Sequence, residues 1–257
     1  MSNITDFFNE NGYYIAKGIF KGNELKILQT DFDKIVDQLQ ESGEHIQARW
    51  GGYSMNQISD KTDYVLHTHQ VHCYAESYAK AFYNKEFLDA TEKIIGPDII
   101  LHHSKLFFKP PEKGAPFPMH QDWGYFPTEK DSMIAAVIHL SDATDEMGCF
   151  RVFPGSHKLG RQQGMVGQES LERRSELLND YPLEKATPLE AEPGDVVFFS
   201  YFLLHGSKPN ISKKPRKTVL VQLYSGNDEI EGENHHVNSK LTLRGWNHRM
   251  TRGKANQ

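Results

Sequence analysis

The chain has 257 residues, of which 38% are hydrophobic, 25% charged and 11% aromatic. This composition is typical of a globular protein and excludes collagen-like, coiled-coil and wholly disordered chains. The 34 acidic residues outnumber the 29 basic ones, for a net charge of −5, so the sequence lacks the electrostatic signature of a protein that binds nucleic acid or an anionic membrane. A small molecule is the expected partner.

The sequence offers little evidence for a secretory signal, a membrane span or a cysteine-based disulfide or zinc site. Residues 1–12 lack the basic start and apolar stretch of a secretory signal. The longest nearly apolar run, Val196–Leu204, is far shorter than the ~20 residues that cross a bilayer. Cys73 and Cys149 have no C-x-x-C spacing, which disfavours a disulfide scaffold or a thiolate zinc site. We expect a cytoplasmic protein, monomeric or homodimeric, that does not associate with membranes.

The first third of the chain is predicted to be mainly helical. Apolar residues recur at helical spacing from Leu25 to Leu39, behind Asn23 as a candidate N-cap. A second helix is predicted from Tyr74 to Ile95, because Gly96-Pro97 is a strong stop signal.

After Pro97 the pattern changes to short apolar runs separated by turns that contain proline and glycine. Such a series predicts a β-sandwich or barrel, with the early helices packed on the outside of one sheet. No repeat or linker divides residues 1–257, so one domain is expected, with a polar helix inserted at Gln168–Asp180. The predicted strands are Ile99–Phe108, Met133–Leu140, Cys149–Phe153, Val196–Leu204 and Val219–Tyr224.

The first chemically informative string is Met119-His120-Gln121-Asp122-Trp123. On a strand, His120 and Asp122 would point to the same face. An imidazole and a carboxylate at this spacing can occupy neighbouring positions on one metal ion, and a second histidine from a distant strand would complete the facial set used by non-haem Fe(II). Alone, the pair is a weak signal, and a hydrogen-bonded histidine beside a solvated aspartate would be the favoured explanation.

A second string supplies the missing histidine. The apolar run that begins at Asp195 ends in His205, and a turn follows before Arg216 opens the next apolar strand. We therefore expect His205 and Arg216 on adjoining strands. The planar guanidinium of Arg216 and the hydroxyl of Ser207 suit the far carboxylate of a dicarboxylate that chelates the metal.

Most of the 13 histidines are expected to play no part in such a site. In the run His102-His103, strand alternation places one imidazole inside and one outside. His235 and His236 lie in a charged region and receive no role. The histidines that either line the mouth of a site or lie on a polar surface loop are His67, His69 and His72.

Taken in order, these motifs resemble the phytanoyl-CoA dioxygenase family of Fe(II)- and 2-oxoglutarate-dependent oxygenases, over nearly the whole chain. The resemblance implies a double-stranded β-helix, a jelly-roll barrel of mainly β structure with flanking helices. The strings that carry the resemblance are Phe7-Phe8 to Gly12-Tyr13-Tyr14, Lys109-Pro110-Pro111, His120 to Pro127, Gly148 to His157, Pro193-Gly194-Asp195, and His205-Gly206-Ser207 with Arg216.

The resemblance also implies roles for individual residues. Iron would be held by His120, Asp122 and His205. The distal carboxylate of 2-oxoglutarate would be held by Arg216, with Ser207 beside it and Lys105 lining the cosubstrate pocket. The aromatic residues that follow the metal-binding string, and are candidates for contact with the primary substrate, are Trp123, Tyr125 and Phe126.

The activity implied is a dioxygenase that uses Fe(II), 2-oxoglutarate and O2 to hydroxylate an unactivated carbon of a small-molecule metabolite. Succinate and CO2 would be released. Two alternatives stay open. The same oxidising chemistry can end in desaturation, epimerisation or cyclisation, because the geometry of the bound substrate decides the outcome. A non-catalytic module that senses the metal or 2-oxoglutarate is the other alternative.

Overall fold

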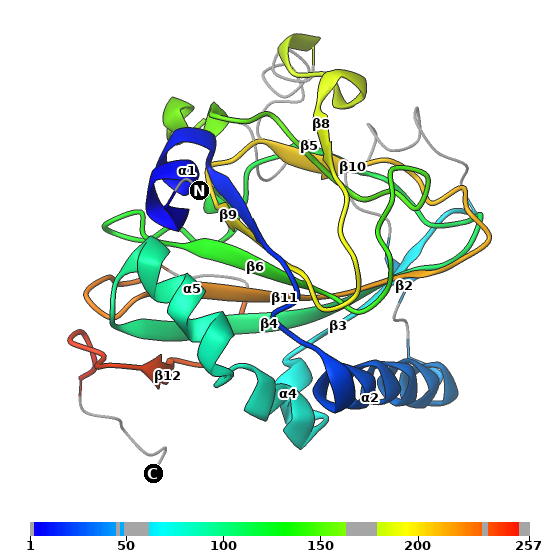
Figure 1. Ribbon diagram of the computed structural model, residues 1–257, viewed down its shortest axis with the longest axis horizontal. Coiled ribbons are helices and arrows are strands. Elements are labelled where there is room, and N and C mark those ends of the chain that lie inside the picture. The colour runs from blue at the N-terminus through cyan, green and yellow to red at the C-terminus, as the bar shows by residue number, and fades with distance from the viewer. Residues whose placement is uncertain (1–2, 45–46, 49–61, 163–178, 233–235, 252–257) are drawn as a thin grey trace.

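The computed structural model describes residues 3–44, 47–48, 62–162, 179–232 and 236–251, and its strands form two antiparallel sheets. The predicted mainly β jelly roll with flanking helices is therefore confirmed (Figure 1). The large sheet has the strand order β1-β9-β6-β11-β4-β3-β2, with β12 also paired to β4. Its strands are β1 (Tyr13–Ala16), β2 (Gln47–Ala48), β3 (Val65–His69), β4 (Ile99–Lys109), β6 (Ile134–His139), β9 (Val196–Ser200), β11 (Arg216–Ser225) and β12 (Leu241–Arg244).

The small sheet faces the large one and has the order β5-β10-β7-β8. It is built from short strands, and the chain passes through β6 of the large sheet between β5 and β7 and through β9 between β8 and β10. Its strands are β5 (Phe117–His120), β7 (Phe150–Val152), β8 (Thr187–Leu189) and β10 (His205–Ser207).

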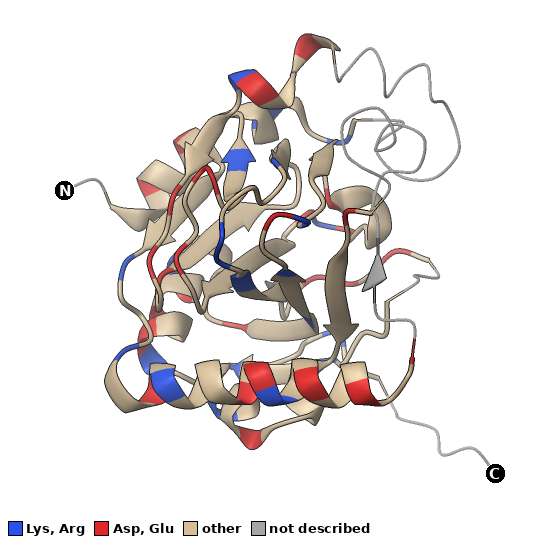
Figure 2. Ribbon diagram, turned by 90° about the vertical axis from the view of Figure 1, so that its right-hand side faces the viewer, with Lys and Arg blue, Asp and Glu red and all other residues tan. Residues whose placement is uncertain are grey.

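Four helices accompany the sheets in the described part of the chain: α1 (Ile4–Asn11), α2 (Gly22–Glu41), α4 (Glu76–Ala81) and α5 (Lys85–Ile95). Helices α2, α4 and α5 lie on the outer face of the large sheet (Figure 1). Acidic and basic residues are mixed along the exposed side of α2 (Figure 2). No helix in the described ranges is long and apolar enough to span a bilayer.

Central strands of the large sheet are buried on both faces, which explains their continuous apolar sequence. In β6, Ile134, Ala136 and Ile138 pack into the core beneath the helices. Ala135 and Val137 pack instead into the core between the two sheets. The same alternation in β11 sends Val219, Val221 and Leu223 toward the helices. Every second side chain from Arg216 to Gln222 is therefore left facing the barrel interior.

Several local predictions need correction. The helix predicted over Tyr74–Ile95 is two helices, because Asn84 accepts a hydrogen bond from the Phe87 backbone N–H and starts α5 as its N-cap. Helix α2 has Lys21 at its N-cap, not Asn23. The strand predicted over Val196–Leu204 ends at Ser200. The polar helix expected at Gln168–Asp180 lies almost wholly outside the described residues.

Candidate active site

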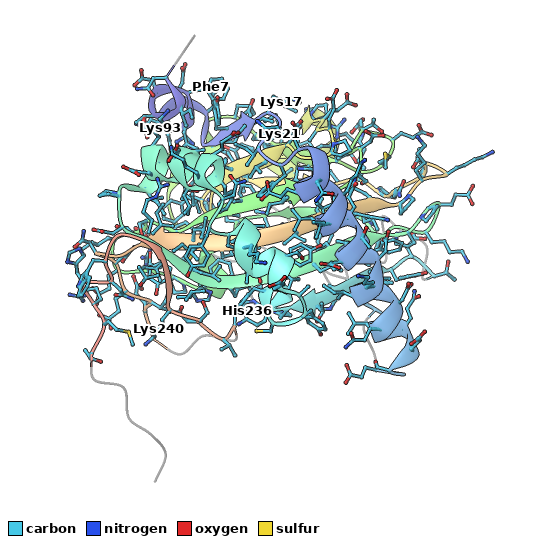
Figure 3. All side chains as sticks on the ribbon, turned by 60° about the horizontal axis from the view of Figure 1, so that its bottom comes forward. Phe7, Lys17, Lys21, Lys93, His236 and Lys240 are labelled. Atoms are coloured by element: carbon cyan, nitrogen blue, oxygen red, sulfur yellow. The ribbon has the colours of Figure 1, made fainter. Side chains whose placement is uncertain are left out.

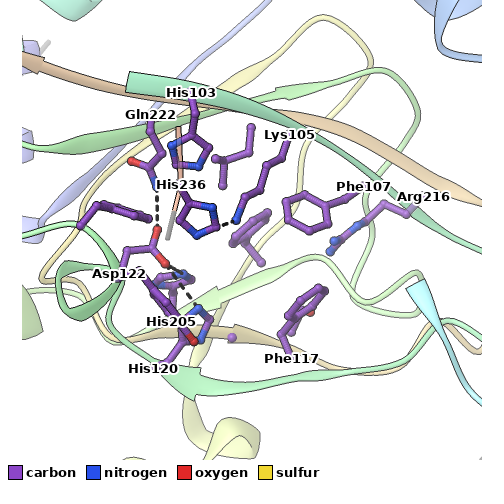
Figure 4. Close-up of a pocket in the computed structure, with 16 residues that line it drawn as sticks. His103, Lys105, Phe107, Phe117, His120, Asp122, His205, Arg216, Gln222 and His236 are labelled. Atoms are coloured by element: carbon purple, nitrogen blue, oxygen red, sulfur yellow. Dashed lines mark hydrogen bonds and ion pairs between the residues drawn. The ribbon is translucent and has the colours of Figure 1, made fainter. Parts of the chain in front are cut away.

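Three side chains with metal-binding atoms converge between the sheets. His120 is the last residue of β5 and His205 the first of β10, and the two are direct partners across this antiparallel pair. Asp122 follows two residues after His120. One ligand atom from each of the three lies within 4.8 Å of the others (Figure 4). The strand geometry considered for His120 and Asp122 does not apply, because β5 ends at His120 and a turn positions the Asp122 carboxylate.

Both imidazoles are oriented by backbone carbonyl groups. The Nδ1 atoms lie 2.8 Å from Pro118 O for His120 and 2.9 Å from Leu203 O for His205. A carbonyl oxygen only accepts, so each Nδ1 carries the hydrogen and each Nε2 presents a lone pair. Those Nε2 atoms lie 3.5 Å and 3.7 Å from Asp122 Oδ1. Burial lowers the pKa of His205 to about 4, so at neutral pH it is a neutral ligand and not half of an ion pair.

Asp122 is held by two hydrogen bonds that leave one carboxylate oxygen facing the histidines. Its backbone N–H donates to Tyr201 O at 2.9 Å, and its Oδ2 accepts from Gln222 Nε2 at 2.9 Å. Burial alone would raise the pKa of Asp122, but the neighbouring imidazoles and Lys105 outweigh it and lower the pKa to about 2. Two neutral imidazole nitrogens and one carboxylate oxygen are the donor set of a non-haem Fe(II) facial site.

Gln121, between the two ligands in sequence, fixes the turn from behind. Its side chain is fully buried, and its Nε2 donates to Phe202 O at 2.6 Å and to Gly160 O at 3.0 Å. Its Oε1 accepts from the Gln162 backbone N–H at 3.1 Å. The bond to Phe202 ties the metal-binding turn to the segment that precedes His205, and the other two bonds tie it to residues 160–162.

A cationic end of the same pocket is formed by Arg216 and its neighbours. Arg216 opens β11 opposite Lys109 of β4, so it lies in the large sheet while His205 lies in the small one. The expectation of adjoining strands is therefore wrong, because the chain crosses between sheets in the turn after Ser207. The two residues face each other across the interior, and both line one pocket of about 690 Å³, a volume that includes space open to solvent.

The Arg216 guanidinium is buried with little to neutralise it. It is 2% exposed, it donates to Gly148 O, and it stacks 5.5 Å from the ring of Phe150. Burial lowers its pKa to about 10, and its Nε has no hydrogen-bond partner among the described residues. A buried cation in this state has the chemistry to bind an anion.

Lys109 adds a second buried nitrogen at this end, which the sequence analysis left without a role. Its Nζ is fully buried and donates to Ser207 Oγ at 2.7 Å and to Lys208 O at 2.6 Å. Since the Ser207 oxygen accepts this bond, its own hydroxyl hydrogen is free to point into the cavity. Burial and the neighbouring Arg216 lower the pKa of Lys109 well below its usual value.

Between the cationic end and the metal ligands lies Lys105. Its side chain lines the cavity, and its Nζ lies 3.4 Å from His236 Nε2. Burial lowers the pKa of Lys105 to about 8. Lys105 thus lines the same pocket as the candidate metal ligands, and its role toward the cosubstrate stays a prediction.

The three aromatic candidates are placed differently. Tyr125 and Phe126 line the cavity. Trp123 is outside the lining, because its ring stacks under the guanidinium of Arg161 at 5.5 Å. Arg161 in turn pairs with Asp131 and Glu231.

Two histidine expectations are overturned. His236, given no role, lines the cavity and stacks on His103 with ring centroids 4.8 Å apart. His102 and His103 are both buried, because a register shift between Gln222 and Leu223 makes His102 the extra residue of a β-bulge and breaks the alternation. Strand alternation that starts from Arg216 could have predicted that Gln222 faces the interior. No local feature of the sequence predicts that the C-terminal segment brings His236 to the site.

Comparisons with known proteins bear on this geometry. A model of the family described as "Phytanoyl-CoA dioxygenase (PhyH)" matches residues 8–218. The chain is 27% identical over 218 residues to a probable alpha-ketoglutarate-dependent hypophosphite dioxygenase of Stutzerimonas stutzeri, covering 82% of this chain and 74% of that protein. It is 27% identical over 222 residues to the human peroxisomal phytanoyl-CoA dioxygenase, covering 83% of this chain and 65% of the human protein.

A solved structure shares the fold. The non-heme alpha ketoglutarate dependent carbocyclase SnoK from nogalamycin biosynthesis superposes with a TM-score of 0.72 at 20% identity. The match covers 88% of this chain and 85% of SnoK.

Proposed function

Because the chain belongs to the phytanoyl-CoA dioxygenase family of Fe- and 2-oxoglutarate-dependent oxygenases, we propose that it hydroxylates an unactivated carbon of a small-molecule metabolite, with release of succinate and CO2. The observation that carries this proposal is one cavity with the His120, Asp122 and His205 donor set at its centre and the buried Arg216 cation at one end. Each group of residues that lines the cavity has its own proposed role in the reaction.

His120, Asp122 and His205 would hold Fe(II). The fit rests on their ligand atoms, which gather within 4.8 Å, and on the two Nδ1–carbonyl bonds that aim Nε2 inward. When bound, the iron supplies oxidative decarboxylation of 2-oxoglutarate by O2, with one oxygen atom going to succinate and the other to a C–H bond of the substrate.

Arg216 and Ser207 would bind the distal carboxylate of 2-oxoglutarate, with Lys105 further along the same molecule. A buried guanidinium and a hydroxyl hydrogen make charge-assisted bonds that are stronger in a buried site than in water. They would hold the cosubstrate at a fixed distance from the metal ligands, which favours reaction by orientation.

Aromatic side chains would exclude water and bind the substrate near the metal ligands. Tyr125 and Phe126 form one wall beside Asp122, and Phe150 and Phe117 lie toward Arg216. A wall of aromatic side chains would keep water from the reactive centre and limit side reactions with solvent.

The experiment is succinate formation by purified, Fe(II)-loaded protein in air with 2-oxoglutarate, first alone and then with fractions of a metabolite library. We expect slow turnover that one fraction accelerates, and a product heavier than its substrate by one oxygen. Asp122→Ala should abolish the turnover, whereas Asp142→Ala, on the exposed surface, should leave it unchanged. Wild-type turnover in Asp122→Ala would refute the site assignment.

The same measurement separates the alternatives. A product that has lost two hydrogens indicates desaturation or cyclisation, and a product of unchanged mass indicates epimerisation. If iron is bound and no condition gives succinate, the protein is a sensor of the metal or of 2-oxoglutarate and the proposed catalysis is wrong.

A further inference from the structure

Two buried polar atoms that line the cavity have no hydrogen-bond partner in the described ranges: Gln222 Oε1 and His103 Nε2. Both side chains are 1% exposed. The orientation of the Gln222 amide follows from chemistry, because Asp122 Oδ2 only accepts and must face the Gln222 Nε2 at 2.9 Å. Gln222 Oε1 is therefore an acceptor with nothing to accept from.

Gln222 and His103 are built into one small subsite. They are direct partners across β11 and β4, so their side chains emerge side by side into the interior (Figure 4). His103 Nδ1 is already paired with His102 Nδ1 at 2.6 Å, which leaves only Nε2 for a ligand.

The walls of this subsite are aromatic. Figure 3 places His236 on the C-terminal segment, at the opposite edge of the molecule from Phe7 and Lys93. Its ring stacks nearly parallel to His103, with an interplanar angle of 12°, and lies 5.7 Å from the ring of Phe126. Phe126 also lies 5.3 Å from His103. The subsite therefore combines flat apolar walls with polar atoms at one point, which is typical of a small-molecule site.

The subsite lies away from the proposed anchor of the cosubstrate. Gln222 lies six residues beyond Arg216 on β11, and at about 3.3 Å per residue this separates their backbones by about 20 Å. A dicarboxylate of five carbons has only four carbon–carbon bonds of about 1.5 Å each, so a molecule held by Arg216 would extend toward the metal ligands and would fill only part of the pocket. Figure 4 shows the two side chains at opposite ends of the pocket.

We propose that Gln222 and His103 bind a hydroxyl or N–H group of the primary substrate, which donates a hydrogen bond to Gln222 Oε1 next to the metal ligands. This inference rests on the proposed function. It names the substrate class as a compact polar metabolite with a hydrogen-bond donor close to the oxidised carbon. A purely hydrocarbon segment in this position would leave a buried acceptor unpaired, and a site of this kind rejects ligands without the donor.

The test uses three probes of similar size: phenol and aniline, which donate hydrogen bonds, and fluorobenzene, which does not. Dissociation constants are measured by ligand-observed NMR on protein loaded with Zn(II) and 2-oxoglutarate. In wild type we expect phenol and aniline to bind roughly tenfold more tightly than fluorobenzene, as expected for one buried hydrogen bond.

In Gln222→Met the preference should fall below about threefold, and the matched surface variant Gln40→Met should keep the wild-type ratio. Since Gln222 also contacts Asp122, His103→Phe serves as a second variant that leaves that contact intact. A wild type without the preference, or a Gln222→Met protein that retains it, overturns the proposal. If Gln222→Met does not fold, the result for His103→Phe decides in the same way.

Failure of the proposed function has a separate signature. Fe(II) and 2-oxoglutarate chelated together give a weak visible charge-transfer band under anaerobic conditions. A missing band refutes the iron and 2-oxoglutarate site. A normal band together with equal affinities for phenol and fluorobenzene refutes only the substrate inference.

Discussion

Lys109→Met is the most informative single substitution at the cosubstrate end of the cavity. The Lys109 Nζ is fully buried and makes two hydrogen bonds, to Ser207 Oγ and to Lys208 O. It lies opposite Arg216 and makes no ion pair with any carboxylate in the described ranges. A carboxylate that arrives at Arg216 favours the protonated form of Lys109, so cosubstrate binding and the proton on Nζ support each other.

Lys109→Met should change the stability of the fold little and should weaken the binding of 2-oxoglutarate. Removing the two hydrogen bonds costs about 1.5–3 kcal/mol each if Nζ is charged. The same change relieves the desolvation of a buried ion, which costs several kcal/mol. These terms largely cancel, so the free energy of unfolding should change by no more than about 2 kcal/mol. Binding of 2-oxoglutarate loses one charge-assisted contribution, and its dissociation constant should rise about 10- to 100-fold.

The assay is an anaerobic titration of the Fe(II) protein with 2-oxoglutarate, followed by its visible band, beside urea unfolding of the same sample. Lys217→Met is the matched control, because Lys217 is next to Arg216 in sequence but points to the outer face and pairs with Asp33. A dissociation constant within threefold of wild type in Lys109→Met would show that Lys109 does not position Ser207. An unfolding loss well above 4 kcal/mol would show that the cancellation is wrong.

Three further predictions concern metal binding and pH. Asp122→Ala should abolish the rise in melting temperature that Mn(II) gives the wild type, measured by differential scanning fluorimetry, and an unchanged rise would remove Asp122 from the ligand set. Burial lowers the pKa of Lys105 from 10.5 to about 8, so at pH 7 the unfolded chain binds that proton more tightly. Lys105→Met should therefore stabilise the metal-free protein at pH 7 by up to roughly 3 kcal/mol. Urea titrations should show that this gain in the free energy of unfolding shrinks as the pH rises from 8 to 10.5. A gain that stays constant over this range would contradict the argument from burial. Five imidazoles have their pKa lowered by burial from 6.5 to about 3–4: the buried His102, His139 and His205 and the half-buried His69 and His236. On acidification these groups are protonated first in the unfolded chain, so the urea midpoint of the metal-free protein should fall from pH 6.5 toward pH 4, and a flat profile would contradict this.

The central strands of the large sheet were predictable because their signal is local, whereas β1, β2, β3 and β12 were not predicted. Ile99–Phe108 and Val219–Tyr224 are rich in apolar residues, and the structure has strands there as β4 and β11. The identity of the metal ligands was also accessible, since His120, Asp122 and His205 carry chemistry that few residue types can supply.

What the sequence did not predict depends on contacts between distant segments. The turn at residues 201–204 moves His205 to the other sheet, although the apolar run continues through it without a break. The β-bulge at His102 arises from its pairing with β11, and no residue within the run marks it. His236 reaches the pocket through a segment whose local sequence is polar and charged. Each of these is decided by tertiary packing, which overrides local preference.

The pairing of β5 with β10 holds two of the metal ligands by a different means from the third. His120 and His205 are partners in one antiparallel ladder, and their rings are oriented by backbone carbonyl groups. Asp122 lies beyond the ladder, on a turn held by Tyr201 O, and its carboxylate is held by Gln222. The two nitrogen ligands thus depend on backbone groups, whereas the orientation of the one anionic ligand depends on a side-chain amide. Loss of that amide should weaken metal binding without disturbing the barrel.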